Sequence, residues 1–380
     1  MTSISKRSLL KTAALAAIAG AVLVGCGKKE EPAPAAAAPA PAAEPAAVTR
    51  AAWVYVGTPG DAGWTFAHDQ ARLATEAHFA GRLQTTAVER VAAGADAERV
   101  FRDLAQQGND IIYGTSFGFM QAMVQVASEF PNVKFEHATG FQLADNLGIY
   151  DSSFFQTSYL AGIIAGHMTQ TGTIGFVASF PIPEVLRNIN AFTLGAQTVR
   201  PDITTRVVWV GAWFDPPKES EAAQSLINQG ADVLLQNTDS TAVLQTAERN
   251  GRFAFGWNSD MSSFSSNAHL ASAIVNWTPH YIASIESLRN GTWQSQRVIG
   301  GVQNGVNELV KVSDVVPAEV RATIDSIKAQ YRAGTFSPFT GPLADNQGNE
   351  VLAAGQVGDR AFLDGMNFYV RGVEGRVPTR

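Results

Sequence analysis

Short apolar, strand-like segments alternate with amphipathic helical segments along most of the chain, and this alternation restricts the possible folds more than any other feature. Residues 51–57 (AAWVYVG) form an apolar run that ends in glycine, which predicts a buried strand. Residues 95–108 carry apolar residues at helical spacing and also end in glycine, which predicts a helix. Strands that alternate with helices are typical of βαβ units, which build parallel sheets.

The alternation runs through the sequence twice, which predicts two lobes. The first series of strands and helices ends near residue 151, and the second runs from about 173 to about 275. Two further helices follow, and with them we expect the chain to cross back to the first lobe. We therefore predict an α/β fold of two doubly wound parallel-sheet lobes that face each other across one ligand cleft. The predicted boundaries are 50–154 with about 278–335 for the first lobe, 155–277 for the second lobe, and 336–380 for an irregular C-terminal segment with one short hairpin.

The N-terminal residues have the composition of an export signal rather than of a folded domain. Basic residues precede an apolar stretch, residues 13–24, that is too short to span a membrane readily. The stretch ends in Leu23-Val24-Gly25-Cys26, which resembles the lipobox of bacterial lipoproteins. We therefore predict a signal peptide over 1–25, lipidation of Cys26 and an alanine- and proline-rich tether over 26–49. The alternative is an ordinary signal peptide with an incidental cysteine.

Charge and composition exclude several classes of partner. The formal net charge is −6 with no basic block after the N-terminus, so nucleic acid is not expected to bind. The chain is 46% hydrophobic and 16% charged, as in globular proteins, and Cys26 is its only cysteine, so no internal disulfide is expected. The six histidines lack the spacing of a metal site, and no P-loop motif occurs. We expect no metal and no cofactor, and we expect a monomer.

Aromatic, amide and carboxylate side chains gather directly after the predicted strands. In a doubly wound sheet, ligands bind beyond the carboxyl ends of the strands, so we expect these side chains to line the cleft. Flat aromatic faces with a few convergent polar groups suit a planar heteroaromatic ligand. The alternative is that the tryptophans, Trp277 included, serve core or hinge packing. The predicted ligand contacts are Asp61, Trp64, Phe117, Trp213, Asn237, Asp239, Trp257, Asn258, Asp260 and Asn276.

Four short motifs follow one another in an order that resembles a known family. They are Asp61-x-Gly63-Trp64, Gly114-Thr115-Ser116-Phe117-Gly118-Phe119, Tyr159-Leu160-Ala161-Gly162 and Gly256-Trp257-Asn258-Ser259-Asp260. Together they resemble the basic membrane protein family, lipid-anchored substrate-binding proteins of ABC importers similar to bacterial purine nucleoside receptors. The resemblance spans about residues 51–333. It implies a type I periplasmic-binding fold that closes on its ligand, an ABC permease as partner, a periplasmic location at the membrane and no catalysis.

Two departures from that family's pattern bear on the ligand. Nucleoside-binding members typically carry an aspartate that grips ribose where this chain has Asn258, and a lysine in the stretch corresponding to 272–277, which has none here. Two charge-assisted hydrogen bonds, each worth roughly 1.5–3 kcal/mol when buried, are therefore missing. Asn258 offers a donor and an acceptor to the edge of a base, and Trp64 and Trp213 are the preferred stacking faces. We therefore expect a purine, and a free base such as adenine rather than a nucleoside.

Two other functions remain open from the sequence. Ser116 lies in a G-x-S-x-G pattern after a predicted strand, as in the nucleophile elbow of serine hydrolases, and Asp145 and His167 follow in the required order. A hydrolase would leave the second α/β series unexplained, so binding is favoured. The other alternative is the ligand-binding component of a sensory system.

Overall fold

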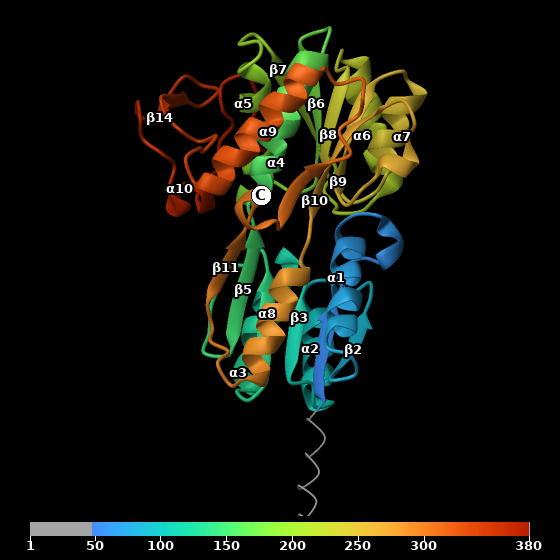
Figure 1. The fold of residues 1–380 in the computed structure, drawn as a ribbon, viewed down its shortest axis with the longest axis vertical. Coiled ribbons are helices and arrows are strands. Elements are labelled where there is room, and N and C mark those ends of the chain that lie inside the picture. Colours follow the sequence, from blue (N-terminus) through green and yellow to red (C-terminus); the bar gives the residue numbers. More distant parts are fainter. Residues whose placement is uncertain (1–47, 380) are drawn as a thin grey trace, which may run out of the picture. The chain divides into compact units, whose positions relative to one another are not determined.

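The computed structural model describes residues 48–379, which form two lobes built on one six-stranded sheet each (Figure 1). The first strand begins at Thr49, so the body starts where the predicted tether ends. The predicted signal peptide, the lipidated Cys26 and nearly all of the tether lie outside the described residues.

The first lobe is built on a sheet with strand order β11-β5-β4-β3-β1-β2, in which all neighbouring strands are parallel. Successive residues of β1 point to opposite faces, so Trp53 packs under α1 and α8 while Val54 packs under α2 and α3. Both faces are therefore buried, which explains why β1 is apolar from Ala51 to Val54. The bounds are β1 Thr49–Val54, α1 Trp64–His78, β2 Leu83–Val88, α2 Ala95–Gln106, β3 Ile111–Gly114, α3 Met120–Glu129, β4 Lys134–Ala138, β5 Leu147–Ser152, α8 Thr278–Arg289 and β11 Arg297–Gly300.

The second lobe has a sheet of order β12-β10-β9-β8-β6-β7, parallel except for β12, which runs antiparallel to β10. Helices α4 and α5 pack on one face of this sheet and α6 and α7 on the other. The bounds are α4 Phe154–Met168, β6 Thr173–Ala178, α5 Pro183–Gln197, β7 Thr204–Trp209, α6 Pro216–Asn228, β8 Val233–Asn237, α7 Ala242–Arg249, β9 Phe253–Asn258, β10 His269–Val275, β12 Asn307–Val310 and α9 Ala318–Ala333.

The chain passes between the lobes after β5, after β10 and after β11. Hydrogen bonds join these crossings to one another. The Ser153 N–H donates to the Gly300 carbonyl oxygen at 2.9 Å, and the Asn276 N–H donates to the Val306 carbonyl oxygen at 2.8 Å. The three crossings are therefore tied together as one hinge.

Residues 278–335 divide between the lobes, which corrects the prediction that assigns all of them to the first. Helix α8 and strand β11 do lie in the first lobe, where β11 pairs with β5. Strand β12 pairs with β10, and α9 packs on α4, both in the second lobe. Helical periodicity predicts that α9 buries one face, but it cannot identify the sheet that covers that face.

The C-terminal segment, residues 336–379, folds against the second lobe, where Figure 1 shows it in red beside α5. Its regular elements are β13 Leu343–Ala344 and β14 Glu350–Leu352, which pair as a hairpin, and the short helix α10 Arg360–Asp364. The Trp209 indole N–H donates to the Tyr369 hydroxyl at 3.0 Å, and the Asn190 side-chain amide donates to the Phe368 carbonyl oxygen at 2.9 Å. Side chains of the second lobe thus fix an otherwise irregular segment.

Helices α4 and α5 pack backbone against backbone through two glycines. A Cβ atom on Gly162 would lie 2.1 Å from the Phe192 carbonyl oxygen, and one on Gly195 would lie 2.1 Å from the Tyr159 carbonyl oxygen. Non-bonded atoms cannot approach so closely, so the helices reach this separation only because both positions are glycine. Helix α5 begins beside the cleft, so its packing on α4 also places residues of the site.

Gly162→Ala should therefore lower the free energy of unfolding by about 1–3 kcal/mol, because the added methyl group forces α4 and α5 apart. Urea or thermal unfolding measures the change. Gly60→Ala is the matched control, since its Cβ would meet only the Thr58 hydroxyl at 3.6 Å. Wild-type stability in Gly162→Ala would contradict the close packing.

Candidate ligand-binding site

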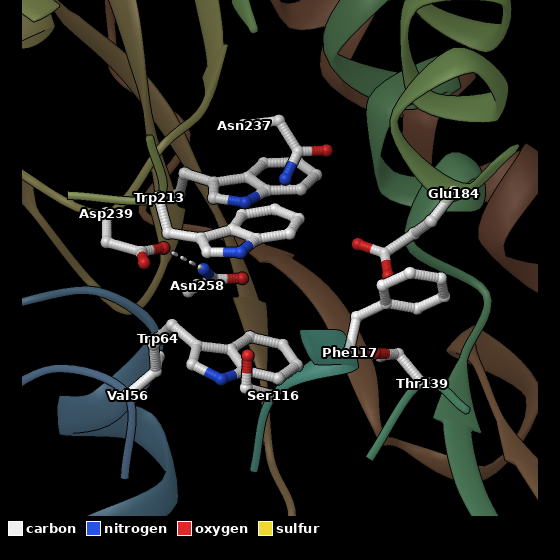
Figure 2. A pocket seen from close by; sticks show the side chains of 11 residues that line it. Val56, Trp64, Ser116, Phe117, Thr139, Glu184, Trp213, Asn237, Asp239 and Asn258 are labelled. Atoms are coloured by element: carbon white, nitrogen blue, oxygen red, sulfur yellow. Dashed lines mark hydrogen bonds between the residues drawn. The ribbon is translucent and has the colours of Figure 1, made fainter. Parts of the chain in front are cut away.

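The carboxyl ends of strands from both sheets surround a pocket between the lobes (Figure 2). It holds about 370 Å³ of space outside the protein atoms, open solvent included. Both lobes contribute to its wall. The lining residues are Val56, Trp64, Ser116, Phe117 and Thr139 from the first lobe and Glu184, Trp213, Asn237, Asp239, Trp257 and Asn258 from the second.

Two tryptophans from opposite lobes provide the aromatic faces of the pocket. The Trp64 indole N–H donates to the Thr115 carbonyl oxygen at 2.6 Å, which fixes the plane of its ring. The Trp213 ring packs against Phe180 with a centroid separation of 5.2 Å. In Figure 2 the Trp64 indole lies below the Trp213 indole, with Phe117 to one side. Because both rings are held by the protein, a flat ligand can stack on them at little ordering cost.

Asn237, Asp239 and Asn258 form a polar edge at the ends of β8 and β9. The Asn258 amide donates to Asp239 Oδ1 at 3.2 Å, and the Asn188 amide donates to Asn237 Oδ1 at 2.6 Å. Asn258 has a φ of 66°, a left-handed conformation that asparagine tolerates better than most residues. Burial, with a smaller contribution from the Asp61 carboxylate, raises the pKa of Asp239 well above its ordinary value. The raised pKa favours the protonated form of the Asp239 carboxyl.

The two lobes touch beside this polar edge. A Cβ atom on Gly63 would lie 2.3 Å from the Asp239 carbonyl oxygen, so only glycine allows the loop before α1 to approach β8 this closely. The Ser259 hydroxyl donates to the Ala62 carbonyl oxygen across the same junction. The structure therefore has a closed cleft.

Most of the predicted contacts meet in this pocket, and the sequence missed four of its lining residues. Those predicted are Trp64, Phe117, Trp213, Asn237, Asp239, Trp257 and Asn258. Thr139 follows β4 directly, so the rule used for strand ends could have identified it, whereas Val56 lies within the predicted strand 51–57. Ser116 lies two residues after β3 and was considered as a nucleophile, not as a ligand contact. Glu184 lies in the first turn of α5, the position that Trp64 occupies in α1, so the same rule could have included it.

Three predicted contacts lie outside the pocket. The Asp61 carboxylate accepts three backbone N–H hydrogen bonds at the start of α1, so it caps that helix. Asp260 and Asn276 are exposed, and each accepts a hydrogen bond from the backbone N–H two residues further along. Trp277 is only 1% exposed and stacks on His68 in the first lobe. It therefore packs in the core, as the alternative interpretation of the tryptophans predicts.

Within residues 48–379 the Ser116 hydroxyl is hydrogen-bonded to no histidine and no carboxyl group, so the serine-hydrolase hypothesis gains no support. His137 Nε2 lies 2.7 Å from the carbonyl oxygen of Ser116 rather than from its hydroxyl, and burial lowers the His137 pKa to about 4. Asp145 and His167 are exposed, and within residues 48–379 neither is hydrogen-bonded to Ser116. The Ser116 hydroxyl instead accepts the Gly118 N–H at 3.4 Å, which shapes the turn after β3.

Neither a clustered metal site nor a membrane-spanning helix occurs in the described part of the chain. It contains no cluster of three or more His, Cys, Asp or Glu side chains that could hold a metal ion. None of its helices is both long and apolar enough to cross a bilayer.

Comparison with known proteins identifies the family. Residues 48–332 match the Bmp family, described as PnrA-like ABC transporter substrate-binding proteins. A purine-binding protein of Brucella abortus is 44% identical over 86% of this chain and 93% of its own length. A putative ABC transporter glucose-binding protein of Haloferax volcanii is 40% identical over 87% of this chain and 81% of its own length.

Solved structures agree on the fold. An ABC transporter solute-binding protein from Conexibacter woesei superposes with a TM-score of 0.63 at 24% identity, covering 76% of this chain and 98% of that chain. A solute-binding protein from Aeropyrum pernix superposes with a TM-score of 0.66 at 16% identity, covering 76% of this chain and 92% of that chain. Both support the type I periplasmic-binding fold of two α/β lobes. The chain belongs to the PnrA-like family of ABC transporter substrate-binding proteins, so it is not an enzyme, it binds a small molecule outside the cytoplasm and its partner is an ABC permease.

Proposed function

We propose that this chain binds a purine in the interlobe pocket, a free base such as adenine in preference to a nucleoside, and delivers it to the permease. The observation that carries the proposal is the pair of aromatic faces, Trp64 and Trp213, beside the polar edge of Asp239 and Asn258. A purine is flat and has hydrogen-bond donors and acceptors along its edge, so it suits such a site. The Brucella relative is named as a purine-binding protein, which supports the same class of ligand.

The free hydrogen-bonding groups of the polar edge match an amino group next to a ring nitrogen. Asn258 uses its N–H on Asp239, which leaves the Asn258 carbonyl oxygen to accept a hydrogen bond. In its protonated form, which the raised pKa favours, the Asp239 carboxyl has one O–H to donate. An amino group of the ligand would donate to the Asn258 carbonyl oxygen, and a neighbouring ring nitrogen would accept the Asp239 O–H. Adenine presents such an edge.

The absence of cationic side chains in the pocket argues against a ribose-binding role. No lysine or arginine occurs among its lining residues, all of which the structure describes. The stretch that corresponds to the family's ribose-binding lysine ends here in Trp277, whose ring packs edge-on against Trp64 at 5.8 Å in the core. Ribose hydroxyls would therefore enter the pocket without a charged partner.

Calorimetry with adenine, adenosine, guanine, xanthine and glucose tests the proposal. We expect adenine to bind most tightly, because it meets the stacking faces and the polar edge without placing hydroxyl groups in the pocket. Glucose belongs in the panel because the Haloferax relative is named as a glucose-binding protein. Tighter binding of adenosine than adenine would overturn the base preference, and binding of glucose alone would replace the purine with a sugar.

In the same assay, Trp64→Ala should weaken adenine binding by about 1–3 kcal/mol, the scale of base stacking on an aromatic side chain. Trp209→Ala is the matched control, since Trp209 contacts Tyr369 and does not line the pocket. Equal losses in both variants would indicate a general effect of removing a tryptophan.

Gly63→Ala should weaken ligand binding by preventing closure, because its new methyl group would overlap the Asp239 backbone. Small-angle scattering should show the wild-type radius decreasing on ligand addition and the variant's radius unchanged. The ligand-induced rise in melting temperature should shrink in parallel. Gly60→Ala, in the same loop, should behave like the wild type. Normal closure of Gly63→Ala would contradict the backbone contact.

We also infer that Cys26 carries the lipid that anchors the protein, a monomer, to the membrane at its periplasmic side. The apolar stretch 13–24 followed by Gly25 and Cys26 supports this assignment. The 22 residues between Cys26 and Thr49 would then tether the folded body.

Cys26→Ala should abolish incorporation of labelled fatty acid in a bacterial host, because no other thiol exists in the chain. Its melting temperature should stay at the wild-type value, since the folded body begins at Thr49. Fatty-acid labelling that persists in this variant would refute the anchor.

A further inference from the structure

Glu184 stands at the side of the ligand pocket away from Asn258 and Asp239. It lies in the first turn of α5 and is half-buried. Figure 2 shows its carboxyl group directed into the pocket across from the polar edge. It also lines an adjoining hollow of about 860 Å³, open solvent included, which shares Phe117 and Thr139 with the pocket. A ligand held between the lobes would therefore meet a carboxyl group at two separate edges.

The Glu184 carboxyl has no hydrogen-bond partner within residues 48–379, unlike the other acidic groups nearby. Asp239 accepts a hydrogen bond from Asn258, and Glu219 accepts one from the Ser240 hydroxyl at 2.6 Å. A half-buried polar group without a partner inside a binding pocket is available to a ligand.

The charged groups around Glu184 are already paired with one another. Arg360 of α10 lies 2.9 Å from Asp151 of β5 and 2.6 Å from Asp364, and Arg187 of α5 lies 3.2 Å from Asp364. No ion pair within residues 48–379 includes Glu184. Arg297 of β11 also lines the adjoining hollow, and it pairs with Asp364 at 2.8 Å.

The electrostatics favour the protonated form of Glu184. Burial first, and then the negative charge of Asp151, raise its pKa to about 8, although Arg187 and Arg360 oppose the shift. Asp239, across the pocket, is the other carboxyl group that faces the ligand, and burial raises its pKa too. In its protonated form, each of these two carboxyl groups donates one hydrogen bond and accepts another.

We propose that Glu184 binds the second edge of the ligand as a neutral carboxyl group and selects a free base over a nucleoside. This proposal rests on the purine function. In adenine, the edge away from the amino group presents a ring nitrogen next to the N9–H. The Glu184 O–H would donate to that ring nitrogen while its carbonyl oxygen accepts the N9–H. A nucleoside carries its sugar on N9, so it lacks this donor and brings bulk against Glu184.

Comparing adenine with 9-methyladenine by calorimetry tests this contact, because the two ligands differ only at N9. The wild type should prefer adenine by about ten- to a hundredfold, the scale of one or two lost buried hydrogen bonds. In Glu184→Ala the two ligands should bind with similar affinity. Glu184→Gln keeps a donor and an acceptor on the same frame, so it should retain the preference for adenine.

The pH dependence provides an independent readout. As pH rises through the pKa of Glu184, its carboxyl loses the donated proton, so wild-type affinity for adenine should fall about tenfold between about pH 7 and about pH 9. Glu184→Gln has no proton to lose, and its affinity should change less over the same range. Asp239→Asn reports separately on titration of the other carboxyl group. Glu374→Gln, an exposed site paired with Arg206, is the matched charge control.

The possible outcomes distinguish an error in the Glu184 contact from an error in the purine function. If the wild type binds adenine but Glu184→Ala keeps both the preference and the pH profile, the Glu184 contact is wrong and the purine function stands. If the wild type binds neither adenine nor 9-methyladenine, both proposals fail. Loss of adenine binding in Glu184→Gln at about pH 7, with an unchanged melting temperature, would contradict the donor–acceptor role.

Discussion

The approach of Gly63 to the Asp239 backbone is the contact on which the ligand pocket depends. It joins the loop before α1 to the end of β8, and it has no room for a side chain at residue 63. Trp64 follows directly, so the same contact places one stacking face of the pocket. Asp239 supplies both the backbone of the contact and the carboxyl group of the polar edge. Closure of the lobes and assembly of the site are therefore one event.

Carboxyl groups inside the pocket and just outside it lie in different electrostatic environments. Asp239 and Glu184 face the pocket, and burial together with neighbouring carboxylates raises the pKa of both. Just outside, Asp151 and Asp364 form ion pairs with several arginines. An ion is costly to bury without a partner, so a pocket lined by carboxyl groups of raised pKa and by no cationic side chain suits an uncharged ligand. The family's ribose-binding pattern relies on charged groups, and its replacement by neutral donors and acceptors is the chemical basis of the base preference proposed here.

The sequence predicts the strand-end part of the site because that part follows from local pattern. Each buried strand ends where its apolar run ends, and residues placed there, such as Trp64, Asp239 and Asn258, meet at one edge of the sheets. Asp260 lies outside the pocket because the chain turns after Asn258. The Asp260 side chain instead accepts the Ser262 backbone N–H in the following turn. Glu184 gives no distinctive signal, because an acidic residue in the first turn of a helix is common and stabilises the helix by itself.

The lobes themselves are predictable, but their boundaries are not, because boundaries depend on which sheet accepts a strand. β12 joins the second sheet by pairing antiparallel with β10, although it follows β11 of the first sheet by a few residues. The pairing of β12 with β10 holds the third crossing against the other two. At the start of β12, the Asn307 side chain accepts a hydrogen bond from the Ser152 hydroxyl, at the end of β5. The second crossing leads directly into Trp277, whose ring lies edge-on to Trp64. Phe154, directly after the first crossing, also packs against Trp64, with a ring separation of 6.0 Å. A hinge rotation that moves Trp277 or Phe154 therefore acts on the stacking face, so aromatic contacts link the crossings to the ligand pocket.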